Sequence, residues 1–127
     1  MPVTTIIDID FHYSRRRGID IEERVIVPLG SNVVWRFKVA EDQDFRTRFY
    51  LRLNVELYFE RDSPFRWRTK SIRYISSPDI LTPVPAEITS EVADSEGEYK
   101  YGVRVTGEGT NERIEYDEDP YLIIRRF

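Results

Sequence analysis

Strict alternation of apolar and polar side chains along residues 49–59 is the feature that most constrains how this chain can fold. Every odd position in the segment is apolar, from Phe49 through Val55 to Phe59. Successive side chains of a β-strand point to opposite faces of its sheet, whereas a helix would spread them around its circumference. The segment therefore predicts a strand with one buried face and one solvent-facing side, which carries Tyr50, Arg52, Asn54, Glu56 and Tyr58.

The same period of two recurs along the chain. It is clear in residues 7–13, 33–39 and 99–105 and weaker in residues 19–27, 66–75, 87–92 and 121–126. Turn-forming residues separate these runs, for example Pro28 to Asn32, Glu60 to Pro64 and Asp94 to Gly97. Residues 76–85 contain three prolines and predict a crossing loop or an edge segment, and residues 86–93 are either a strand or a single helical turn. About eight strands with one apolar face each predict an all-β fold, an antiparallel two-sheet β-sandwich with Ig-like or cupredoxin-like Greek-key topology, forming a single domain over residues 1–127.

Composition argues against several kinds of chemistry. The chain has no cysteine and one histidine, His12, so disulfides, zinc fingers, iron–sulfur sites and thiol nucleophiles are excluded. No phosphate-binding glycine loop, zinc-protease motif or serine-hydrolase elbow occurs. We therefore expect a non-enzymatic protein with no cofactor and no metal.

Calcium is the one metal with any sequence support. The acidic run Asp117, Glu118 and Asp119 could act with Asp94, Glu96 and Glu98 as oxygen ligands, but the spacing does not match a calcium-binding loop. We expect the run to be a solvated turn instead.

Charge is distributed unevenly. Residues 1–76 carry 14 basic and 11 acidic side chains, and residues 77–127 carry 5 basic and 12 acidic ones. Such asymmetry indicates either an interaction surface or two halves that attract each other. The chain shows no signal-peptide pattern and no membrane-spanning apolar run, so we expect a cytoplasmic protein with no membrane partner.

Arginine and aromatic residues alternate along residues 66–68, and three arginines follow one another at residues 15–17. Basic grooves with aromatic platforms bind single-stranded nucleic acid. The sequence pI of about 5.1 opposes this function. We expect Arg66 and Arg68 to face Arg52 and Glu56 across neighbouring strands, as arginine and glutamate rows often do.

Two segments resemble known families. Residues 27–35 (VPLGSNVVW) are similar to the turn and Val-x-Trp strand of cupredoxin-like sandwiches. Residues 97–105 (GEYKYGVRV) and the later residues 119–124 (DPYLII) resemble the closing hairpin of Ig-like and cupredoxin-like bacterial domains. The resemblance implies a metal-free sandwich of that topology. Copper electron transfer is not implied, because cysteine is missing and His12 lies in the wrong region.

We therefore expect a β-sandwich that binds another protein or self-associates, through its edge strands and an arginine-rich face. A small-molecule or carbohydrate site on Tyr50, Tyr58 and Trp67 is the first alternative, and single-stranded nucleic-acid binding is the second. The candidate binding residues are Arg48, Tyr50, Arg52, Tyr58, Arg66, Trp67 and Arg68.

Overall fold

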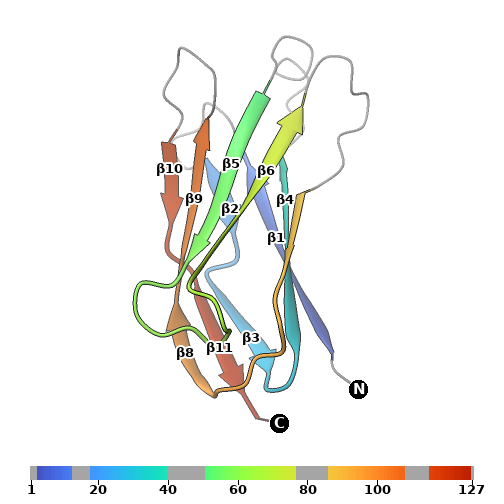
Figure 1. Cartoon of the computed structure of the whole chain (residues 1–127), viewed down its shortest axis with the longest axis vertical. Helices are drawn as coiled ribbons and strands as arrows, with labels where there is room; N and C mark the ends of the chain where they lie inside the picture. The colour runs from blue at the N-terminus through green and yellow to red at the C-terminus, as the bar shows by residue number, and fades with distance from the viewer. Residues whose placement is uncertain (1–2, 13–17, 40–50, 77–85, 108–114, 127) are drawn as a thin grey trace.

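A computed structural model describes residues 3–12, 18–39, 51–76, 86–107 and 115–126 of the chain. All regular structure in these residues is β-strand (Figure 1). The eleven strands of the described residues are β1 (Thr4–Phe11), β2 (Ile19–Ile21), β3 (Arg24–Pro28), β4 (Asn32–Val39), β5 (Leu51–Tyr58), β6 (Thr69–Ser76), β7 (Ala86–Thr89), β8 (Gly97–Lys100), β9 (Gly102–Gly107), β10 (Glu115–Glu118) and β11 (Tyr121–Arg125).

The described strands form three open sheets. Their orders are β2-β1-β4-β7, β10-β9-β5-β6 and β3-β11-β8. Two pairs are parallel, β1 with β4 and β3 with β11, and the other pairs are antiparallel. The prediction of an all-β protein is thus confirmed, but the prediction of purely antiparallel pairing is wrong. Alternation reveals which face of a strand is buried, and it carries no information about the direction of the neighbouring strand.

The strand predictions also differ in detail. The two runs 19–27 and 99–105 are each interrupted, the first at Glu22 and Glu23 and the second at Tyr101. The strand predicted from residue 66 begins at Thr69. Residues 86–89 form β7, so the strand reading of the segment holds there and the helical turn does not. The acidic run 117–119 was predicted as a solvated turn, whereas its first two residues, Asp117 and Glu118, belong to β10.

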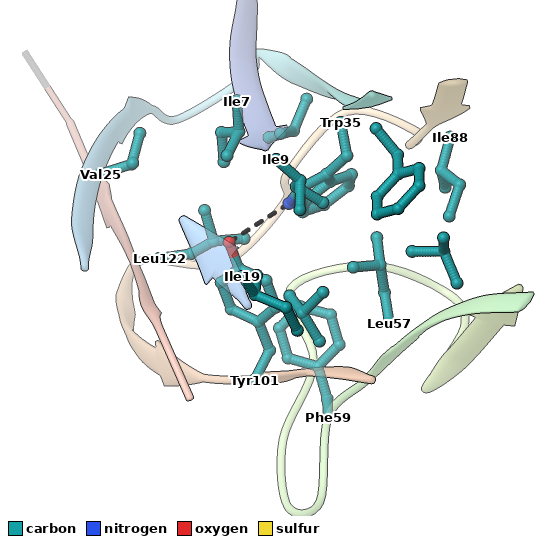
Figure 2. Packing of buried hydrophobic residues seen from close by; sticks show 14 of the residues in the cluster. Ile7, Ile9, Ile19, Val25, Trp35, Leu57, Phe59, Ile88, Tyr101 and Leu122 are labelled. Carbon is teal, nitrogen blue, oxygen red and sulfur yellow. Dashed lines mark hydrogen bonds between the residues drawn. The ribbon is translucent and has the colours of Figure 1, made fainter. Parts of the chain in front are cut away.

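Side chains from all three sheets meet in one core, whose members point inward from the surrounding strands (Figure 2). Leu53, Val55 and Leu57 of β5 are fully buried, as the alternation in this segment predicted. At the centre, the Trp35 indole N–H donates a hydrogen bond of 3.2 Å to the Tyr101 hydroxyl, drawn as the dashed line in Figure 2. Burial of the phenol raises the pKa of Tyr101 well above its usual value.

Candidate functional site

Five of the seven predicted binding residues lie in the described part of the chain. Arg48 and Tyr50 lie outside the described residues. Arg52 and Tyr58 occupy the outward face of β5, whereas residues 66–68 belong to the connection between β5 and β6. The candidates that the structure describes are therefore divided between a sheet face and a loop.

Trp67 faces the core instead of solvent. Its ring stacks on Phe65, with centroids 5.4 Å apart and planes 14° apart, and it meets Trp35 edge-on at 6.0 Å. The Lys70 ammonium lies over the Trp67 ring at 5.1 Å. Trp67 thus acts mainly as a packing residue.

The expected pairing of Arg66 and Arg68 with Glu56 is wrong. Arg68 turns back on its own loop, where its Nε donates to the Arg61 carbonyl at 3.1 Å. Glu56 instead lies opposite Arg104 of β9, with the guanidinium and carboxylate 3.5 Å apart. The sequence shows that Arg66, Arg68 and Glu56 are present, but which side chains pair depends on which strand lies next to β5.

Tyr58, the last residue of β5, contacts Asp117, Arg104 and Gly102. Its hydroxyl donates to Asp117 Oδ1 at 2.9 Å, and the Arg104 guanidinium lies 4.9 Å from its ring centroid. The ring covers Gly102, where an added Cβ would approach Tyr58 Cζ to 2.0 Å. Burial of the phenol and its hydrogen bond to the Asp117 carboxylate together raise the pKa of Tyr58 to about 12.

Residues 59–68, which we call the 59–68 arch, leave the sheet after Tyr58. The arch is closed by a hydrogen bond of 2.7 Å from the Phe59 amide to the Arg68 carbonyl. Inside it, the Phe65 amide donates to Ser63 Oγ at 3.1 Å, while the Phe59 and Phe65 rings pack at a centroid distance of 6.0 Å. These contacts join the two ends of the arch and pack its aromatic side chains together.

Because β5 ends at Tyr58, it pairs with β9 but does not extend alongside β8. Strand β5 pairs with β9 as far as Tyr58 opposite Gly102, and within the described residues β11 is the only hydrogen-bonded neighbour of β8. The Tyr101 amide donates to the Pro120 carbonyl at 3.0 Å. Backbone hydrogen bonds alternate along an antiparallel pair, so Tyr99 also bonds toward β11. The N–H and C=O groups of Glu98 and Lys100 therefore point away from β11, along an open edge.

An open hollow of about 900 Å³, which we call the β8 groove, follows this edge. It is lined by strand β8 and by residues 60–62 of the arch. Tyr58, Asp119 and Tyr121 are also among its lining residues. The Arg24 guanidinium lies over the Tyr121 ring at 5.3 Å and forms an ion pair with Glu98, so it covers the side of the groove next to β3.

A second hollow of about 550 Å³, which we call the β2 hollow, shares Asp119 with the β8 groove. It is lined by residues of the β2 region and of the β10–β11 connection, including His12, Asp20 and Glu23. None of the described residues that line it is a lysine or an arginine. In the described part of the chain, no three histidine, aspartate or glutamate side chains are arranged so that they could hold a metal ion.

Lys100 and Tyr121 of the groove were not predicted as binding residues, and Glu98 and Asp119 were considered only as possible calcium ligands. Their arrangement depends on where β5 leaves the sheet. The only local indications were the turn-forming residues 60–64 and Pro120, which has no amide hydrogen to extend the ladder.

No protein-family model and no curated protein sequence matches the chain. Among the described residues, none forms a helix with the length and hydrophobicity needed to cross a membrane.

Proposed function

We propose that this protein is a binding module that recruits an extended segment of another protein as an additional strand on the edge of β8. The observation that carries this proposal is the end of β5 pairing at Tyr58 and Gly102, directly beside a groove along an edge of β8 that no other described strand pairs with. Such an edge offers main-chain donors and acceptors to any extended peptide, and the groove walls select its side chains.

The geometry of the arch favours this function. An incoming strand that continues the line of β5 would lie between β8 and residues 60–62, both of which line the β8 groove. The arch is fixed by its aromatic contacts and by the hydrogen bond between Phe59 and Arg68. A wall that is already ordered reduces the conformational entropy lost on binding.

Proline substitution at the edge tests the proposal. Lys100→Pro removes an amide hydrogen that points into the groove and leaves the bonds to β11 in place, whereas Lys100→Ala removes the side chain alone. Peptides selected from a displayed random library should bind the wild type and Lys100→Ala with similar Kd values. Lys100→Pro should weaken binding by about tenfold or more, since main-chain pairing supplies the affinity.

Amide hydrogen exchange provides the second readout of the same experiment. Bound peptide should slow exchange at Glu98 and Lys100. Peptides that bind Lys100→Pro as tightly as the wild type, or that protect amides elsewhere, would refute pairing at this edge. So would a library that yields no binding peptide.

Carbohydrate binding through aromatic side chains is less well supported. A sugar stacks on an open ring face, but Arg104 lies over Tyr58, Arg24 lies over Tyr121 and the core contacts Trp67. Nucleic-acid binding is also less well supported. One of the arginines on which it depends, Arg68, instead donates a hydrogen bond to the Arg61 carbonyl. Self-association through the same edge would be detected as a concentration-dependent dimer by analytical ultracentrifugation.

A two-layer sandwich remains our proposal for the topology. The pairs Gly97 with Ile124 and Thr106 with Glu115 lie in one unbroken register, so β8 and β9 together pair with β10 and β11 as a single hairpin. This continuity supports joining the sheets β10-β9-β5-β6 and β3-β11-β8 into one layer, as in the Ig-like and cupredoxin-like sandwiches that the sequence resembles.

A further inference from the structure

The charge around the open edge indicates which segment it would take. The β8 groove and the β2 hollow meet at Asp119, and together nine carboxylates and three basic side chains line them. Counting His12 as neutral, the described residues that line the two hollows have a net charge of −6. The whole chain has a net charge of −4, so this described lining is more negative than the chain as a whole.

Part of this charge is neutralised within the protein. Glu98 pairs with Arg24, Asp117 with Arg104 at 3.3 Å, and Glu96 with Arg126 at 3.6 Å. Other carboxylates remain: within the described part of the chain, no ion pair involves Asp20, Glu23, Glu60, Asp62, Glu118 or Asp119. Arg61 and Lys100 of the groove are likewise in no ion pair, so the six carboxylates and two cations of this unpaired, described lining have a net charge of −4.

We infer that the partner is a basic extended segment, rich in lysine or arginine, which pairs with β8 and runs past Asp119 into the β2 hollow. This inference rests on the proposed function, because the edge fixes the backbone of the segment. The carboxylates then select its side chains, since opposite charges steer association and like charges oppose it. The Arg24 and Arg104 guanidinium groups lie over the rings of Tyr121 and Tyr58, which shows that aromatic rings and cations pack together here.

Three peptides test this charge preference. They alternate threonine with lysine, glutamine or glutamate over about twelve residues, because threonine favours the extended backbone. Fluorescence polarisation should show the lysine peptide binding about tenfold or more tightly than the glutamine peptide, with the glutamate peptide weakest. Affinity for the lysine peptide should fall as the salt concentration rises from about 50 to about 500 mM, where screening shortens the range of the attraction.

A charge-neutralised variant locates the effect. The triple variant Asp20→Asn, Glu23→Gln and Asp119→Asn should lose most of the preference for lysine, because it removes three exposed carboxylates of the two hollows. The matched control Asp8→Asn, Glu91→Gln and Asp94→Asn changes the net charge equally at exposed positions outside them and should keep the preference.

Each possible result leads to a different conclusion. If the lysine and glutamine peptides bind equally and both are weakened by Lys100→Pro, the edge binds segments but the charge preference is refuted. If both triple variants lose the preference equally, the attraction comes from the overall charge of the protein and the assigned surface is wrong. If Lys100→Pro has no effect on any peptide, the edge itself is not the binding site and the proposed function fails.

Discussion

Tyr101 belongs to the buried core and directly follows β8, the strand that lines the groove. Its side chain and that of Trp35 are 2% and 1% exposed, and the hydroxyl is the acceptor for the indole N–H. Tyr101→Phe leaves this buried donor without a partner. We expect the free energy of unfolding to fall by about 1–3 kcal/mol, measured by urea denaturation. An unchanged unfolding midpoint would show that the indole N–H finds another acceptor.

The raised pKa values of Tyr58 and Tyr101 predict alkaline instability. Both phenols are neutral in the folded protein at pH values where the unfolded chain, with tyrosine pKa values near 10, has begun to ionise. The stabilisation is therefore complete below about pH 10 and is lost as the pH rises toward the folded-state values. Urea unfolding between pH 9 and 12 should show a smaller loss of stability in the double variant Tyr58→Phe and Tyr101→Phe than in the wild type. An equal loss would contradict this assignment.

Gly102 is the position at which the absence of a side chain is needed. Since an added Cβ would approach Tyr58 Cζ to 2.0 Å, Gly102→Ala must move the ring away from Asp117. We expect the pKa of Tyr58 to decrease from about 12 toward its usual value of about 10, as measured by NMR titration of the phenol. Gly30→Ala controls for backbone strain without a ring contact: its φ of +88° disfavours alanine, but its Cβ would contact nothing within 4 Å, so the pKa of Tyr58 should not change. An unchanged pKa of Tyr58 in Gly102→Ala would refute the proposed packing.

At the scale of single elements, β5 shows what the sequence could predict. Its alternation correctly assigned Leu53, Val55 and Leu57 to the core and Arg52 to the solvent-facing side. Alternation could not predict that β5 pairs with β9 and ends opposite Gly102. That pairing joins residues far apart in the chain, and it determines whether the edge of β8 is covered.

The core face of β5 should dominate its contribution to stability. Leu57→Ala removes a fully buried side chain and should lower the free energy of unfolding by about 2–5 kcal/mol, measured by urea denaturation. Asn54→Ala, on the outward face of the same strand, should change it by less than about 0.5 kcal/mol. Similar effects of the two substitutions would contradict the assignment of the two faces.

At the scale of the whole molecule, the candidate site depends on topology more than on composition. The predicted arginine-rich face was based on residues close together in the sequence. The β8 groove instead joins the arch, β8, Asp119 and Tyr121, which only the folded arrangement brings together. The acidic character of the second half of the chain was evident from the sequence, but its concentration beside an open edge was not.

Native-state amide hydrogen exchange, followed residue by residue by NMR on the free protein, tests the open edge most directly. If β8 bonds only to β11, the amides of Tyr99 and Tyr101 should be protected, whereas those of Glu98 and Lys100 should exchange much faster. Equal protection of all four amides would mean that another part of the chain already pairs with this edge, and would contradict the account.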